Sequence, residues 1–305
     1  MKKILLSTTL LVATAGVAAA EVTLSGSGRF GLNYDESRTG QETQLSYRFR
    51  TEFNGSKETD SGVTFGGRVR LQNTQSGGQS TLSAAYVYAK YEGLEVQVGN
   101  ANGALDSVAL IYNSEIGFTG FSAGDPIGVN ASFSSGPYTG TPNRVGIFVT
   151  YGIADLNVFA SYHTLDQTVT NADEIFSVAA DYKFGAITVS GGYESYSATL
   201  AANDTDTFAI AAQYGFSDVG NVGLLYFDVS GATGADANKV TLYGNYTFDA
   251  VTVRAFVSSG DNLGTEDVAY GIGADYDLGG ATLAGGVQVD FDDNTYAELG
   301  VKFSF

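Results

Sequence analysis

The chain has 305 residues, including 40 glycines, 3 prolines, 19 tyrosines and 19 phenylalanines, and it has no cysteine or tryptophan. Its 33 Asp and Glu outnumber 15 Lys and Arg, and the formal net charge of −18 excludes nucleic acid as a partner bound through a general electrostatic field. Without cysteine there are no disulfides and no thiolate chemistry, and one histidine leaves little for a catalytic triad or a multi-histidine metal site. The composition therefore favours a folded protein that is not an enzyme.

The first twenty residues predict a secretory signal peptide. Lys2 and Lys3 precede an apolar stretch that starts at Ile4 and ends in the small residues 18–20, which fit an A-x-A cleavage site. A membrane anchor is disfavoured because the apolar stretch is too short to span a bilayer and no stop-transfer pattern follows. We expect the mature chain to begin at Glu21 and to form one domain over residues 21–305.

After Glu21 the dominant pattern is alternation of apolar and polar residues, which places successive side chains on opposite faces of a strand. In the first segment Val22, Leu24, Phe30 and Leu32 share one parity, and Arg29 has the other. Segments of this kind predict about sixteen strands, an estimate good to two strands because the fourth and eleventh do not assign cleanly to one face. In chain order they span 22–34, 44–54, 62–73, 81–91, 94–100, 144–151, 156–163, 174–184, 187–196, 206–216, 222–230, 239–248, 251–258, 267–278, 281–290 and 295–305.

Short turns alternate with long polar loops along these segments, and aromatic residues gather beside the short turns. The aromatic positions are Tyr91, Tyr151, Phe184, Phe216 and Phe248. A soluble sandwich or solenoid has no reason for such a ring, whereas a transmembrane barrel places one at the membrane interface. Charges on one parity suit a water-filled lumen. We therefore predict an all-β fold, a closed antiparallel transmembrane β-barrel.

The chain ends in an alternating segment whose last residue is Phe305. A strand cannot remain unpaired in lipid, so this segment is expected to pair with the first strand and close the barrel. Closure is then expected to bring Phe305 near Glu21.

One connection, residues 101–143, is much longer than the others and contains Pro126, Pro137 and Pro142. Long connections without regular structure are usually functional or disordered. This one combines apolar clusters at 109–112 and 116–118 with Asp106, Glu115 and Asp125. Because apolar residues need a packing surface, we predict that the loop folds into the lumen as a constriction. An exposed surface loop is the alternative.

Seven of the eight arginines have lumen parity, the exception being Arg38. They are Arg29, Arg48, Arg50, Arg68, Arg70, Arg144 and Arg254. A turn centred near residue 58 would place Arg48 opposite Arg68, and the first hairpin would place Arg29 beside Arg48 or Arg50. The first five then form a basic cluster on one wall, which the acidic loop residues are expected to face, creating a transverse field that selects permeants. Ordinary solvated lumen residues are the alternative.

Four segments carry a family resemblance: EVTLSGSGRFGLNY at the start of the mature chain, TDSGVTFGG in the third strand, the turn ADYDLGGA and the ending LGVKFSF. With these the chain resembles the sixteen-stranded general porins of photosynthetic α-proteobacteria, the Rhodobacter and Rhodopseudomonas type. The resemblance covers most of the mature chain, is strongest at both ends and is weak in the loops. It implies a homotrimeric channel in the lipid of the outer membrane, with the third loop forming a constriction.

Two further groups of residues could carry chemistry. His163, in the segment SYHTLDQ near a strand end beside Asp166, is interpreted as a loop histidine without a catalytic role. Acidic loop segments offer hard oxygen ligands that suit Ca²⁺, although none matches an EF-hand, and no cofactor is required. The weak calcium candidates are Asp204, Asp206, Asp261, Asp267, Asp292 and Asp293.

The functional expectation is a water-filled channel for passive diffusion of ions and small hydrophilic solutes. The acidic chain predicts a weak preference for cations, which the basic cluster opposes. A secreted or surface β-rich adhesin or coat protein without a channel is the alternative, and it would be soluble without detergent.

Overall fold

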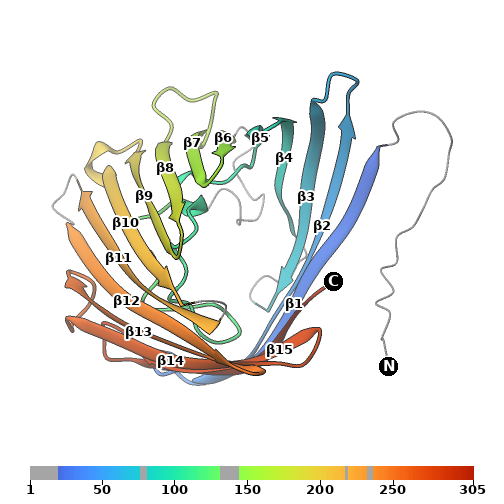
Figure 1. Ribbon diagram of the computed structural model, residues 1–305. Helices are drawn as coiled ribbons and strands as arrows, with labels where there is room; N and C mark the ends of the chain where they lie inside the picture. The colour runs from blue at the N-terminus through green and yellow to red at the C-terminus, as the bar shows by residue number, and fades with distance from the viewer. Residues whose placement is uncertain (1–19, 76–80, 131–143, 217–218, 232–235) are drawn as a thin grey trace, which may run out of the picture.

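The computed structural model describes residues 20–305 except 76–80, 131–143, 217–218 and 232–235. In this part of the chain sixteen antiparallel strands pair in chain order, and β1 also pairs with β16, so the sheet is a closed barrel (Figure 1). The strands are β1 (Glu21–Asp35), β2 (Thr43–Glu58), β3 (Thr64–Thr74), β4 (Thr81–Tyr91), β5 (Leu94–Gly99), β6 (Val145–Ile153), β7 (Leu156–Thr164), β8 (Glu174–Phe184), β9 (Ile187–Ser197), β10 (Thr205–Gly215), β11 (Gly220–Gly231), β12 (Ala237–Phe248), β13 (Val251–Asp261), β14 (Val268–Asp277), β15 (Ala281–Val289) and β16 (Thr295–Ser304). The predicted barrel is confirmed.

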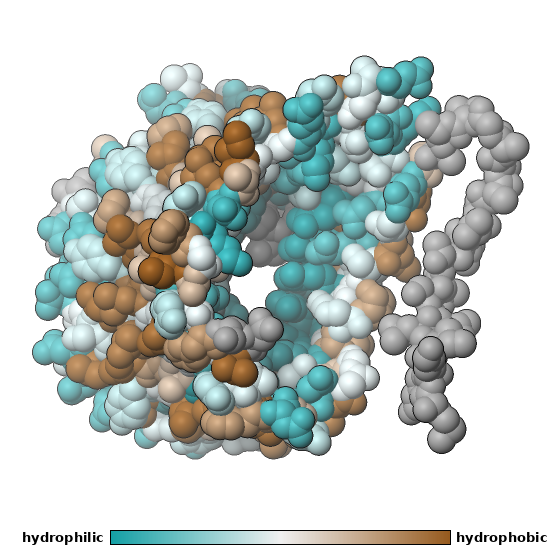
Figure 2. All heavy atoms as spheres, viewed as in Figure 1, coloured by the Kyte–Doolittle hydropathy of each residue, from teal (hydrophilic) through white to brown (hydrophobic). Residues whose placement is uncertain are grey.

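Alternation along the strands separates an apolar outer face from an inner face that carries most of the polar side chains. In β8, Phe176 and Val178 are exposed on the outside, whereas Ser177 and Asp181 are buried on the lumen side. Hydrophobic side chains lie over the outside of the barrel, and hydrophilic ones line the opening through it (Figure 2). The outer face therefore meets lipid, where exposed apolar side chains are favourable.

Closure of the barrel joins the two ends of the chain. Gly26 and Phe305 exchange two backbone hydrogen bonds, of 2.9 and 3.0 Å, and the Phe305 ring stacks on Phe49 at 5.8 Å. Glu21 lies farther along β1, where that strand pairs only with β2, opposite Ser56. The expected closure is confirmed, but Phe305 meets Gly26 rather than Glu21.

The turn between β2 and β3 lies later in the chain than predicted. The backbone N–H and the hydroxyl of Thr59 both donate to the carbonyl oxygen of Val63, at 2.8 and 2.9 Å. This five-residue turn pairs Glu58 with Thr64, and the strand register places Arg48 opposite Thr74. The expectation that Arg48 lies opposite Arg68 was therefore wrong, because side-chain bonding within the turn sets the register.

The short turns, the start of β1 and the end of β16 lie at one rim of the barrel, and the longer loops lie at the other. The aromatic residues predicted beside the short turns are mostly exposed on the outer face, with Phe184 and Phe248 among the most exposed. Two short 3₁₀ turns, η1 (Leu105–Ser107) and η2 (Ala201–Asn203), lie in loops. No helix in the described part of the chain is long and apolar enough to cross a membrane.

His163 is a strand residue and not a loop residue, which corrects the sequence interpretation. It lies in β7 with 1% of its surface exposed, and its Nε2 is 3.3 Å from the carbonyl oxygen of Ala101. A Cβ atom at the neighbouring Gly146 would lie 1.9 Å from the imidazole ring, so the ring occupies the space that this glycine leaves open. His163 therefore packs against the first residues of the long loop, just after the end of β5.

Candidate functional site

The long loop after β5 lies inside the barrel over its described residues, 100–130 (Figure 1). Leu105, Ile111 and Ile116 are at most 3% exposed and pack against lumen-facing side chains that include Phe227 and Phe256. The main apolar cluster of the molecule is therefore formed between this loop and the inner wall. The predicted inward fold is confirmed for this part, and residues 131–143 lie outside the described residues.

Buried polar side chains of the wall bind the backbone of the loop. The Ser161 and Ser177 hydroxyls accept from the N–H groups of Ala104 and Leu105, both at 2.9 Å. Backbone groups away from water require such partners, because an unpaired one costs about 1–3 kcal/mol. Further wall partners of the loop backbone are Asp181, Glu194, Thr207, Lys239, Gln288 and Glu298. This bonding fixes the loop along a wall built by β7 to β16.

Glycines on the last strands make room for the loop side chains. A Cβ atom at Gly300 would lie 2.7 Å from the Phe118 ring, and one at Gly271 would lie 2.9 Å from Ile116. Such distances are too short for real side chains, so the wall is recessed where the loop crosses it. The apolar segment 116–118 is visible in the sequence, but the recess is not, because lumen glycines look like ordinary strand glycines.

One carboxylate, Glu52, lies among the arginines of β1 to β3 and was not among the predicted site residues. Glu52 accepts from Arg70 Nε at 2.8 Å and forms an ion pair with Arg68 at 3.6 Å. Arg68 also lies over the Tyr86 ring, 4.7 Å from its centre, and Arg50 donates to Gln72 at 2.8 Å. The sequence carries a signal for Glu52, because it has the same parity as Arg48 and Arg50 and therefore faces the lumen with them.

Arg29 and Arg48 form the other half of the cluster. They are directly opposite in the register of β1 and β2, as one of the two predicted alternatives had it. On its other side Arg29 is opposite Lys302 of β16. Arg48, Arg29 and Lys302 therefore form a row of three cations across adjacent strands, and Lys302 was not among the predicted site residues.

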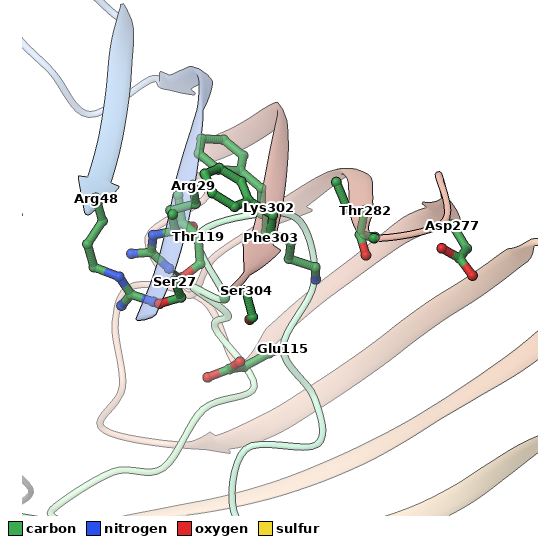
Figure 3. A pocket seen from close by; sticks show the side chains of 15 residues that line it. Ser27, Arg29, Arg48, Glu115, Thr119, Asp277, Thr282, Lys302, Phe303 and Ser304 are labelled. Atoms are coloured by element: carbon green, nitrogen blue, oxygen red, sulfur yellow. Dashed lines mark hydrogen bonds between the residues drawn. The ribbon is translucent and has the colours of Figure 1, made fainter. Parts of the chain in front are cut away.

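The structure brings only one of the three predicted loop carboxylates to this row. Glu115 lines a cavity of about 540 Å³ together with Arg29, Arg48 and Lys302, and its side chain points across the cavity (Figure 3). Asp106 instead accepts a hydrogen bond from Tyr112, and Asp125 accepts from the backbone N–H of Ser122 at 3.0 Å.

Burial raises the pKa of all three loop carboxyls. The pKa of Glu115 rises to about 7, because the loss of water outweighs the attraction of Lys302 and the arginines. The pKa of Asp125 also rises to about 7 through burial and the charge of Glu115, and the pKa of Asp106 is raised by burial. Glu115 and Asp125 therefore change charge near neutral pH.

A second cavity separates the rest of the basic cluster from the loop. It has a volume of about 340 Å³ and is lined by Arg68, Arg70 and Tyr86 on the wall and by Asn102 and Ser107 on the loop. Asn102 Nδ2 donates to the Ser107 hydroxyl at 2.8 Å. The loop thus narrows the lumen between charged and polar walls, an arrangement that lets water and small polar solutes pass.

The calcium candidates do not gather. No group of three or more potential ligands that could hold a metal ion occurs among the described residues. Asp204, Asp206, Asp261 and Asp292 each accept a nearby hydrogen bond, from Ala198, Tyr193, Asn238 and Thr265 respectively. Asp267 and Asp293 lie in separate loops.

Comparisons with known proteins agree with this geometry. Residues 7–296 match the family described as Gram-negative porin. The chain is 41% identical over 295 residues to a porin of Fuscovulum blasticum and 31% identical over 315 residues to a porin of Rhodobacter capsulatus, in each case over 93% of this chain and 100% of the relative. A solved variant of the porin of Rhodopseudomonas blastica is similar with a TM-score of 0.85 and 40% identity, over 93% of this chain and 100% of that one.

Proposed function

The chain belongs to the Gram-negative porin family, and from this premise we propose how its channel selects solutes and how the protein assembles. It is an outer-membrane porin whose barrel encloses a water-filled channel for passive diffusion of ions and small hydrophilic solutes. The observation that carries this function is the closed barrel narrowed from inside by residues 100–130. Family membership indicates a channel rather than an enzyme, and it does not favour the adhesin alternative.

We propose a weak preference for cations. Exposed carboxylates in the long loops support it, because they surround one rim of the barrel and raise the local concentration of cations. They include Glu36, Asp267, Asp292 and Asp293, together with Asp261 at the end of β13. The basic cluster inside the lumen opposes this effect, so the preference is expected to be small.

The test is a planar-bilayer recording of the purified protein in a KCl gradient. Stepwise conductance reports the channel, and a reversal potential that favours K⁺ supports the cation preference. A reversal potential that favours chloride would show that the arginines outweigh the rim carboxylates.

We further propose export through the signal peptide 1–20 and assembly as a homotrimer in outer-membrane lipid. The basic start, apolar stretch and small residues before Glu21 support cleavage there. N-terminal sequencing of the mature protein tests the cleavage site, and native mass measurement in detergent tests the trimer.

No cofactor is needed for this function, and calcium remains the weak candidate. Conductance and thermal stability measured with and without a chelator test for a calcium site. A decrease in either quantity on chelation would support the site, and unchanged values would argue against it.

A further inference from the structure

Three cations stand side by side on the inner wall near the rim that carries the short turns. The registers pair Arg48 with Arg29 and Arg29 with Lys302, so the three side chains form one row across β2, β1 and β16. Directly opposed side chains in a sheet have Cβ atoms about 4.5–5.5 Å apart, and like charges at that distance destabilise the sheet. The row therefore needs negative charge near it.

The described part of the protein supplies some of that charge, since Glu298 and Glu115 both attract Arg29. Arg29 donates to the carbonyl oxygen of Thr119, and Lys302 pairs at 3.3 Å with Asp275, which also binds Arg254 at 3.2 Å. Arg48 makes no hydrogen bond or ion pair with any described residue, and its buried Nε has no partner. Among the described residues, the Arg48 guanidinium of the row therefore has no hydrogen-bond or ion-pair partner.

The row faces open space. The cavity of about 540 Å³ is lined by Arg29, Arg48 and Lys302, with Ser27 and Thr282 also reaching it (Figure 3). Two carboxylates line the same cavity: Glu115 lies across it, and Asp277 lies at the end away from the arginines, where it accepts from the Gly279 N–H at 2.8 Å. Arg29 and Arg48 lie together at the end of the cavity away from Asp277, whereas Lys302 is already paired with Asp275 (Figure 3).

We propose that this cavity is a binding site for a small doubly charged oxyanion, of the class of inorganic phosphate and short dicarboxylates. Arg29 and Arg48 present two planar guanidinium groups, which match the paired oxygens of such an anion, and Lys302 adds a point charge beside them. The Ser27 and Thr282 hydroxyls complete a polar lining. The site holds a solute in the lumen before it leaves, which goes beyond unselective diffusion and rests on the proposed channel.

Isothermal titration of the full protein in detergent tests the site without relying on conductance. The probes are inorganic phosphate at pH 8, succinate, and acetate as a singly charged control. We expect phosphate, succinate or both to bind more tightly than acetate, and the stronger of the two identifies the preferred oxyanion. Equal binding of all three, or no binding, would overturn the proposal.

Variants locate the site. Arg48→Gln and Lys302→Gln are each expected to weaken binding about tenfold, because each removes a charged hydrogen-bond donor. Glu115→Gln is expected to tighten binding, because it removes a repelling carboxylate. The matched control is Arg68→Gln, which removes the same charge from the same lumen but outside this cavity, and is expected to change affinity less than about twofold.

Two further results separate the possible failures. If Arg48→Gln does not fold, Arg48→Lys keeps the charge without the planar group and is expected to weaken binding. Equal weakening in Arg48→Gln and Arg68→Gln would show a general lumen field and no site. Stepwise conductance in KCl is recorded separately: normal conductance without anion binding refutes this site alone, whereas absent conductance refutes the channel.

Discussion

Glu115 is the loop carboxylate that faces the cations of β1, β2 and β16, and its charge depends on pH near neutrality. Burial keeps its pKa at about 7, although Lys302, Arg29, Arg254 and Arg48 all favour the ionised form. A carboxyl with a raised pKa is neutral below that value and negative above it. The balance of charge in the constriction therefore changes between pH 6 and pH 8.

We predict that acidification from pH 8 to pH 6 shifts the reversal potential in a KCl gradient toward anions. Protonation of Glu115 removes a negative charge from a cavity that contains Arg29, Arg48 and Lys302. In Glu115→Gln the shift is expected to be smaller, since the carboxyl nearest the cations is gone while Asp125, whose pKa is also about 7, still titrates. Removing Glu115 also relieves its repulsion of Asp125, so the remaining step should move to lower pH. An unchanged titration in Glu115→Gln would contradict this assignment.

Lys239 is one of the wall residues that bind the later part of the loop. It is 2% exposed, and its ammonium group donates to the carbonyl oxygens of Ala123, at 3.2 Å, and of Asp125. A buried ammonium group is costly unless it is satisfied, so these bonds keep the loop in place as long as the lysine is there.

We predict that Lys239→Met loosens the loop and increases the current noise of the open channel. The change leaves two loop carbonyl oxygens without their donor, at a cost of about 1.5–3 kcal/mol in loop stability. Lys183→Met is the matched control, because Lys183 is exposed near a short turn. Equal noise in the two variants and the unmodified channel would show that other wall contacts suffice.

At the scale of elements, the barrel can be built without the long loop, because a short turn can replace that loop. Gly99 and Gly146 are directly opposite in the register of β5 and β6, so a short turn can join these strands in place of residues 101–143. Apolar wall residues such as Phe227 and Phe256 would then meet water, and some loss of stability is expected.

We predict that this replacement raises single-channel conductance and the size limit for neutral sugars, because the loop occupies the lumen. Shortening residues 262–267, a long loop between β13 and β14, is the control and should leave both values unchanged. A replaced loop with unchanged conductance and size limit would mean that the narrowest part of the channel lies elsewhere.

Strand parity and closure were predictable because they follow from local alternation and from the requirement that strands in lipid are paired. The inward loop was predictable because its apolar residues needed a surface. The turn at Thr59 was not, since it depends on hydrogen bonds between the Thr59 hydroxyl and the backbone of Val63, and its shift moved Arg48 away from Arg68. The recess at Gly300 and the orientation of Asp106 also depend on contacts between distant segments, which a single sequence does not display.

At the scale of the whole molecule, a closed barrel leaves its backbone hydrogen bonds inside the sheet, so side chains alone meet the lipid. Leu242 and Ile272 face outward and are about half exposed, whereas Thr252 faces the lumen beside Thr247, at 2.9 Å between hydroxyls. The outer face of these strands therefore contacts lipid and the inner face contacts water. Arginine substitutions on the two faces test this assignment directly.

We predict that Leu242→Arg or Ile272→Arg lowers the free energy of unfolding by about 2–4 kcal/mol, because the charge is then held in hydrocarbon. Thr252→Arg should cost much less, since its charge enters a lumen that already contains Arg254 and Asp275. Urea unfolding of the protein refolded into lipid vesicles measures both, with the folded fraction read from mobility in gels without heating. Because every strand alternates, a slip of one residue in β12 or β13 would exchange the two faces. Equal costs for the outward and inward arginines would therefore reject the assignment of faces, and with it the lumen position of the basic cluster.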